Sequence, residues 1–345
     1  MRSFLPIVFM GVAILFSTKS LAQNFENPGD YMGAISQQQE NISKKFMSYA
    51  SAAAHGKRAK KVENLRSKLL DEVQEARMNI SGMPSYKGDK SLRDTAVNFM
   101  KFYYNVLNDD YSKIVNMEEI AEQSYDQMEA FLMAQEMVDK KLDEANERMK
   151  TASESFAAKN NVTLVEGKSK LGDMTKKVSE LNKYYHEVYL IFFKASVQEN
   201  YLLEAVSKGN ITGIEQSKGS LLKYAQEGLE KLKSIKSYEG DNDLVSATST
   251  MLNFYVNEAK GKMSTISDYF LTKQRFETTK KEFEKKSSPT NEDRDNYNKM
   301  VNEINKASQD YNKAGQDLNK ERNTVLNDWN KAVNHFFDEH TPHYK

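Results

Sequence analysis

The chain has 345 residues, 39% of them hydrophobic and 28% charged, and its 49 basic residues balance 49 acidic ones. Because the two signs are interspersed, the composition argues against a nucleic-acid ligand, which needs a basic face, and against electrostatic docking on an anionic membrane. The 5 prolines and 15 glycines favour long helices, with room for two domains. No cysteine occurs, which excludes disulfides and thiol sites.

Residues 1–22, MRSFLPIVFMGVAILFSTKSLA, have the pattern of a secretory signal peptide. Arg2 supplies an early positive charge, an apolar run follows, and the small residue Ala22 predicts cleavage before Gln23. A membrane anchor is the alternative, but the run is shorter than the roughly 20 residues that a span needs. The longest later apolar run, Val188–Phe193, is shorter still. We therefore predict no transmembrane segment in the mature chain.

Two stretches of the chain repeat each other. Glu63–Ile114 aligns with Glu215–Ile266 without a gap, with 15 identities in 52 positions. The identical pairs include Leu69/Leu221, Leu70/Leu222, Gln74/Gln226, Phe102/Phe254, Tyr103/Tyr255 and Asn105/Asn257. This similarity indicates an internal duplication.

Each copy contains one conserved-looking pentapeptide, SYKGD at Ser85–Asp89 and SYEGD at Ser237–Asp241. Gly88 and Gly240 can take the positive φ of a turn or a helix end. The candidate caps of the next helix are Asp89 or Ser91 in the first copy, and Asp241 or Asp243 in the second. We predict a corner between two helices at both places.

A calcium loop is the alternative at the second corner, because Asp241 and Asp243 resemble the start of an EF-hand. Such a loop needs further oxygen ligands, a central glycine and a late glutamate at fixed offsets. Val245, Ala247 and Leu252 occupy those places. The helix corner is therefore the preferred interpretation.

Long helices are predicted after each corner. In the first copy, apolar residues at spacings of three and four indicate a packing seam of the coiled-coil type. Its members are Met128, Phe131, Val138, Leu142, Ala145, Met149, Ala152 and Phe156, with Gln135 as the polar exception. In the last helix an Asn-Lys pair follows Tyr297, Ile304, Tyr311, Leu318 and Trp329. Three steps of seven and one of eleven keep these apolar residues on one stripe, with a stutter in the last step.

The other connections follow from composition. The segment Tyr184–Val206 is apolar nearly all round, so we expect it to be enclosed on several sides. Asn160–Gly167 is the predicted connection between the copies. A second interruption is predicted at Ser287–Asp295, which contains a proline and the cap-like Thr290.

We predict an all-α fold of two tandem antiparallel bundles. Their ranges are 1–22 for the signal peptide, 23–160 for the first copy, and 161–345 for the second copy including the connection 161–167.

Motifs for chemistry are absent from the sequence. No Glu-x-x-His pair of the di-iron bundles occurs, and no phosphate loop or nucleophile elbow is present. His186 is interpreted as a packed histidine. The C-terminal His335, His340 and His343, with Asp338 and Glu339, could hold a divalent ion, although a solvated tail is the commoner arrangement. We therefore predict no catalytic, cofactor-binding or metal residues, no cofactor and no enzyme activity.

Several stretches resemble a family of uncharacterised exported bacterial proteins that are labelled as surface proteins. They are EEIAEQSYDQMEAFLMAQE at Glu118–Glu136, YLIFFKASVQENYLLEA at Tyr189–Ala205, LNFYVNEA at Leu252–Ala259, and the end of the chain. The resemblance implies export in a diderm bacterium and a helical fold. It carries no activity and no functional residues.

The favoured hypothesis is a non-catalytic exported scaffold or interaction protein of the bacterial envelope, in the periplasm or at the cell surface, with a protein partner. The alternative is a protein that binds a small ligand or a metal in the aromatic junction of residues 184–193. Its members are Tyr184, Tyr185, His186, Tyr189 and Phe193, for which core packing is the plainer interpretation. A helical pore-forming protein would need a longer apolar hairpin than Val188–Phe193.

Overall fold

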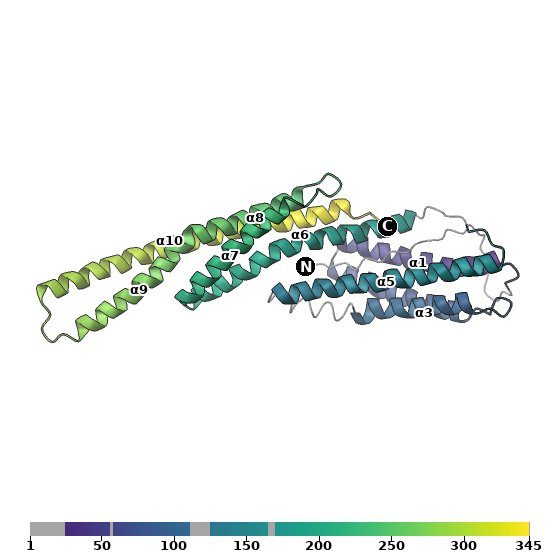
Figure 1. Cartoon of the computed structure of the whole chain (residues 1–345), viewed down its shortest axis with the longest axis horizontal. Helices are drawn as coiled ribbons and strands as arrows, with labels where there is room; N and C mark the ends of the chain where they lie inside the picture. The colour runs from purple at the N-terminus through teal and green to yellow at the C-terminus, as the bar shows by residue number, and fades with distance from the viewer. Residues whose placement is uncertain (1–24, 56–57, 111–124, 165–169, 345) are drawn as a thin grey trace. The chain divides into compact units, whose positions relative to one another are not determined.

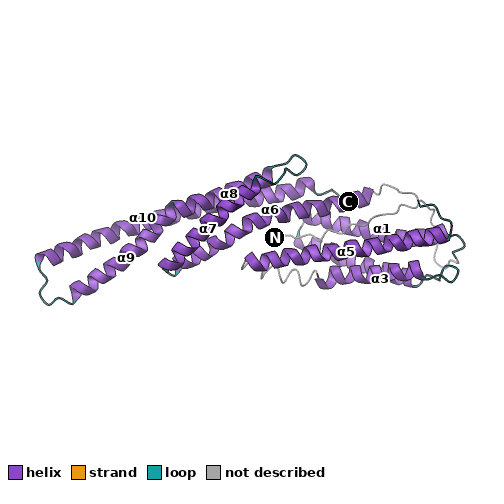
Figure 2. Ribbon diagram, viewed as in Figure 1, coloured by secondary structure: helices purple, strands orange, loops and turns teal. Residues whose placement is uncertain are grey.

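The structure is a computed structural model that describes residues 25–55, 58–110, 125–164 and 170–344. These residues are almost entirely helical, and none of them belongs to a strand (Figure 2). The predicted all-α class is therefore confirmed. The predicted signal peptide at 1–22 lies outside the described residues.

The helices divide between two compact units. The helices are α1 (Pro28–Ala54), α2 (Ala59–Ser81), α3 (Ser91–Asn105) with a π-helical turn η1 (Val106–Asp110), α5 (Tyr125–Lys159), α6 (Lys170–Ser207), α7 (Ile211–Leu232), α8 (Asp243–Lys260), α9 (Lys262–Glu284) and α10 (Asn291–His340). The first unit contains the described part of Met1–His186 together with Asn334–Lys345, and the second contains Glu187–Val333. Both α6 and α10 contribute to each unit. The domain boundary predicted at residue 160 stays a prediction.

In the first unit, α1 packs against α2, and α2 packs against α3. Helix α3 also packs against α5 (Figure 1). Asn27 caps α1, since its Oδ1 accepts the Gly29 N–H at 2.8 Å, and Pro28 suits the first helical position. Aromatic rings join distant segments of this core, because the Tyr31 ring lies 5.5 Å from that of Tyr86 and 5.4 Å from that of Phe156. In the predicted seam of α5, Met128, Leu142, Met149 and Phe156 are buried, and Ala145 and Ala152 are half-buried. The predicted seam residues Phe131 and Val138 have side chains outside the described set.

In the second unit, α7 packs against α8, and α9 contacts both. The stripe predicted for α10 turns inward: Leu318 and Trp329 are buried, while Tyr297, Ile304 and Tyr311 are half-buried. The Trp329 ring stacks on Phe192 of α6 at 4.4 Å. This burial agrees with the heptad spacing read from the sequence.

The repeated pentapeptides form the same corner twice. Tyr86 and Asp89 exchange backbone hydrogen bonds of 3.0 and 2.9 Å, and Tyr238 and Asp241 exchange bonds of 3.0 and 2.8 Å. The two central residues have positive φ in both turns, 47° and 86° at Lys87 and Gly88, and 51° and 93° at Glu239 and Gly240. Asp89 Oδ1 accepts the N–H of Ser91 at 2.8 Å, and Asp241 Oδ1 accepts that of Asp243 at 2.7 Å. The predicted corners are confirmed, and Asp89 and Asp241 accept the first N–H of the next helix, while Lys90 and Asn242 occupy the N-cap positions.

The helices on either side of the corner also correspond. Their first residues are separated by the same 152 positions, Ala59 and Ile211 for α2 and α7, Ser91 and Asp243 for α3 and α8. Equivalent positions face the core, as at Leu69 and Leu221, which are both fully buried. The aligned segments therefore share the turn, the first residues of the helices and the buried position at Leu69 and Leu221.

Two interruptions shape the end of the second unit. Gly261 separates α8 from α9, and a Cβ there would lie 2.8 Å from the Asn257 carbonyl oxygen. The predicted break at 287–295 separates α9 from α10, and Thr290 caps α10 as expected. Its Oγ1 accepts the Asp293 N–H at 3.2 Å, and Asp293 Oδ2 accepts the Thr290 N–H at 2.9 Å.

Candidate functional site

The aromatic junction predicted at residues 184–193 is occupied by packed rings. Tyr185, Tyr189 and Phe193 are all buried. The Tyr185 ring lies 4.9 Å from Phe337, and the Tyr189 ring stacks on Phe193 at 5.5 Å. Burial lowers the pKa of His186 to about 4, so this imidazole is neutral at physiological pH. These contacts agree with core packing, and ligand binding at the junction stays a prediction.

The C-terminal segment is docked on the first unit, whereas its sequence is typical of a solvated tail. His55 Nδ1 lies 2.6 Å from Asp338 Oδ1, and the His343 ring stacks on His55 at 3.8 Å. The Tyr344 N–H donates to Ser51 Oγ at 3.0 Å. Buried Phe336 and Phe337 end α10 and hold the segment in place. His335 lies on the exposed side, 3.4 Å from Glu339.

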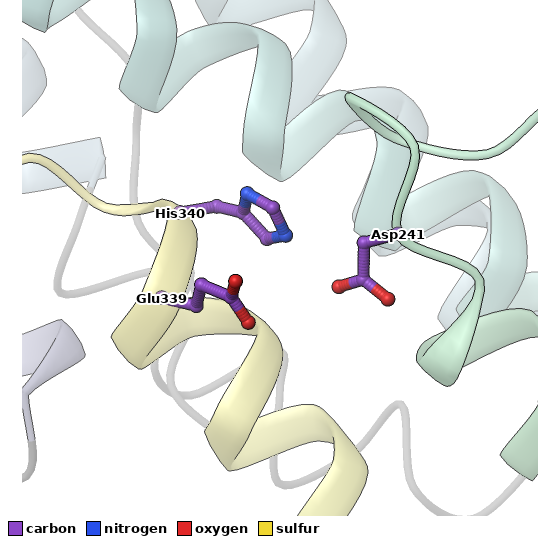
Figure 3. Close-up of side chains that lie close together, drawn as sticks. All are labelled: Asp241, Glu339 and His340. Atoms are coloured by element: carbon purple, nitrogen blue, oxygen red, sulfur yellow. The ribbon is translucent and has the colours of Figure 1, made fainter.

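Figure 3 draws the side chains of Asp241, Glu339 and His340. Asp241 belongs to the turn before α8 in the second unit, whereas Glu339 and His340 end α10 in the first unit. Because the two units are not placed relative to each other, no metal site is assigned to these three residues.

A buried group of charges in the second unit was not predicted from the sequence. Arg322 of α10 donates from Nε to Glu199 Oε1 of α6 at 2.5 Å, and from its second terminal nitrogen to Glu258 Oε1 of α8. We call Glu199, Glu258 and Arg322 the charged cluster. Glu199 is 5% and Glu258 1% exposed. Buried carboxylates at this depth are uncommon unless they are paired.

The charges of this cluster do not balance if both carboxyl groups are ionised. One guanidinium then faces two carboxylates, and Glu258 Oε2 is buried without a hydrogen-bond partner. Burial, together with the charge of Glu199, raises the pKa of Glu258 to about 8, although the positive charge of Arg322 opposes the shift. At neutral pH the cluster is therefore best described with a proton on Glu258.

Polar and aromatic side chains extend the cluster along the same three helices. Tyr255 lies one turn before Glu258 on α8 and is buried, and burial with the charge of Glu199 raises its pKa well above the ordinary value. Two turns after Arg322, the Trp329 indole N–H donates to Thr248 Oγ1 at 3.1 Å. The arrangement fixes α6, α8 and α10 against one another and can hold a proton.

The sequence does contain a signal for this cluster. The eleven-residue step from Leu318 to Trp329 is a step of four followed by a step of seven, and Arg322 occupies the position between them. On α8, the buried stripe that contains Thr248, Met251 and Tyr255 continues to Glu258. A charged residue on an apolar stripe indicates a buried partner, which only the fold identifies.

Comparison of the chain with protein-family models, with curated proteins and with solved structures found no match. Among the described residues, no helix combines the length and the apolar character required to cross a membrane.

Proposed function

We propose that the protein is a non-catalytic, exported helical scaffold or interaction protein of the bacterial envelope, located in the periplasm or at the cell surface. The signal-like residues 1–22 and the resemblance to exported surface proteins support export. We also propose that the two corresponding helix pairs descend from one duplicated module. The observation that carries the interaction role is an exposed helical arm.

The arm consists of residues 273–313, the end of α9 and the first half of α10, which lie side by side (Figure 1). None of its residues is buried. The rings of Phe283 and Tyr297 stack at 4.6 Å, and those of Tyr269 and Tyr311 lie 4.5 Å apart at its base. Steps of seven separate these residues on both helices. The arm is thus a two-stranded antiparallel coiled coil, and no third helix of the described part of the chain buries any of its residues.

An arm of this kind gains little stability from a core, because each seam residue is covered by only one partner helix. It exposes the outer faces of two helices, which carry charges of both signs such as Lys273, Glu277, Lys306 and Asp310. A polar, rigid, accessible surface suits contact with a protein partner. The mixture of charges does not favour nucleic acid.

Site-specific photo-crosslinking in the native envelope tests this role. A photoreactive amino acid at the exposed arm position Asn302 should give a discrete adduct with one partner, whereas the exposed control position Glu75 on α2 should give none. Absence of an adduct from Asn302 and from a second arm position, Lys306, would contradict the proposal. Equal labelling from Glu75 would contradict it as well.

A shortened arm provides the matched variant. Deletion of residues 277–283 and 297–303 removes seven residues from each helix and keeps the turn between them. Phe276 and Ile304 then take the places of Phe283 and Tyr297, so the seam stays in register. With the photoreactive amino acid at Lys306, which the deletion keeps, we expect the variant to retain its helical content and its melting temperature but to lose the crosslinked partner. Retention of the partner would place the binding surface elsewhere.

A further inference from the structure

The hydrogen bonds of the charged cluster leave one buried carboxyl oxygen, Glu258 Oε2, without a donor. Arg322 donates one hydrogen bond to an oxygen of Glu199 and one to an oxygen of Glu258, so both carboxyl groups share its guanidinium. Glu258 Oε2 is buried and has no hydrogen-bond partner. An ionised carboxylate is costly at such a position, whereas a protonated carboxyl is not charged. The geometry therefore identifies Glu258 as the group that takes up the proton.

Arg322 is the cation that the described residues bring to Glu258. From α6 it faces Glu199, from α8 Tyr255, and from α10 Arg322. On the other helices of this unit, Lys262 of α9 pairs with Glu321 at 3.1 Å, and Glu215 of α7 pairs with Lys218 at 2.7 Å and accepts a hydrogen bond from Ser267. Loss of the proton would leave one uncompensated negative charge between three helices.

We propose that Glu258 is the proton-binding group of a pH-sensitive lock. In the neutral form of Glu258, α10 is held on α6 and α8; release of the proton loosens α10 around Arg322. This lock is independent of the proposed scaffold function, because its residues lie outside the arm.

The sign of the pH dependence follows from the direction of the shift. The pKa of Glu258 is about 8 in the folded protein and 4.5 as its ordinary value. Between these values the folded state holds a proton that the unfolded state has lost. The stability of the second unit therefore falls as the pH rises from about 4.5 to about 8, and the lock opens above that range.

The chain contains a single tryptophan, Trp329, which reports on this region. It lies two turns from Arg322 on α10, stacks on Phe192 of α6 and donates to Thr248 of α8. Its emission and its quenching by acrylamide, recorded from about pH 6 to about pH 9.5, measure the docking of α10 in the intact chain. Carboxyl carbon NMR of glutamate-labelled protein measures the titration itself.

In the wild type we expect one carboxyl to titrate near pH 8, with a parallel increase in the quenching of Trp329. Glu258→Gln, which keeps the shape of the neutral carboxyl, should abolish both transitions. Glu199→Gln should shift them to lower pH, because it removes a negative charge that disfavours ionisation of Glu258.

Three results would overturn the proposal. The first is a wild-type spectrum in which no carboxyl titrates between about pH 6 and about pH 9.5, a test that does not depend on whether a variant folds. The second is persistence of the transition in Glu258→Gln. The third is a titration of Glu258 that leaves the quenching of Trp329 unchanged, because the protonation of Glu258 would then not control the docking of α10.

Discussion

The pair α2–α3 and the pair α7–α8 have the same corner and the same spacing of helix starts, yet their buried faces differ in chemistry. Ala96 and Thr248 are equivalent and are both fully buried. Val106 and Glu258 are also equivalent, and each is 1% exposed. One backbone arrangement thus holds apolar residues in the first unit and polar ones in the second.

The polar residues that are buried on α8 depend on hydrogen-bond donors from α10. Thr248 Oγ1 accepts a hydrogen bond from the Trp329 indole, and Glu258 Oε1 accepts one from the Arg322 guanidinium, and both donors come from α10. The capping bonds of the corner are local instead, because Asp89 and Asp241 each accept the N–H of the residue two positions later. Local geometry can therefore be repeated while the long-range contacts diverge.

The largest expected effect comes from removal of the shared cation. Arg322→Met leaves two buried carboxyl groups without their donor, and we expect a loss of about 3–5 kcal/mol from the unfolding free energy of the second unit. Urea unfolding followed by Trp329 emission measures it. The control is Arg66→Met on α2, whose partner Glu63 is exposed, with an expected change of about 0–1 kcal/mol. Equal losses from both variants would contradict the role of the cluster.

A smaller effect is expected where the second helix pair is given the residue of the first. Thr248→Ala, which matches Ala96, leaves the Trp329 N–H buried without an acceptor and should cost about 1–3 kcal/mol. The control is Thr250→Ala on the exposed side of α8, where the change should stay within about 0.5 kcal/mol. Thermal unfolding distinguishes the two. If Thr248→Ala behaves like its control, the indole bond contributes nothing.

The smallest loss of stability is expected from replacing the glycine of each corner, and it should be the same in both copies. Gly88→Ala and Gly240→Ala place a side chain at φ of 86° and 93°, with no atom within 4 Å of the new Cβ in either case. The penalty is then the conformational one alone, about 1–2 kcal/mol. Circular dichroism during urea unfolding of each variant measures it. Penalties that differ by more than about 1 kcal/mol would show that the two corners are not equivalent.

Local patterns in the sequence predicted the local structure well. The glycine-aspartate corner, the Thr290 cap and the heptad stripe of α10 each depend on residues close together in the chain, so composition and spacing suffice. The break at Gly261 does not follow from the sequence, because a single glycine is tolerated in a helix. The structure shows why the residue is glycine, since a Cβ there would lie 2.8 Å from the Asn257 carbonyl oxygen.

The contacts that define the candidate site lie far apart in the sequence, which is why they escaped prediction. Arg322 and Glu199 are separated by 123 positions, and Tyr344 and Ser51 by 293. Arg322 occupied the gap in the apolar stripe, and Glu258 continued the stripe of α8, but neither pattern names its partner. The docking of the C-terminal segment on the first unit was not predicted either, because its contacts also join residues far apart in the sequence.

Hydrogen exchange of the intact chain at about pH 6 and about pH 9, corrected for intrinsic rates, tests most directly whether the two helix pairs differ in their response to protons. We predict that α8 and the part of α10 around Arg322 lose protection at the higher pH, while α3, the counterpart of α8, keeps its own. Equal responses of α3 and α8, or no response in either, would contradict the claim that the buried charges set the second pair apart.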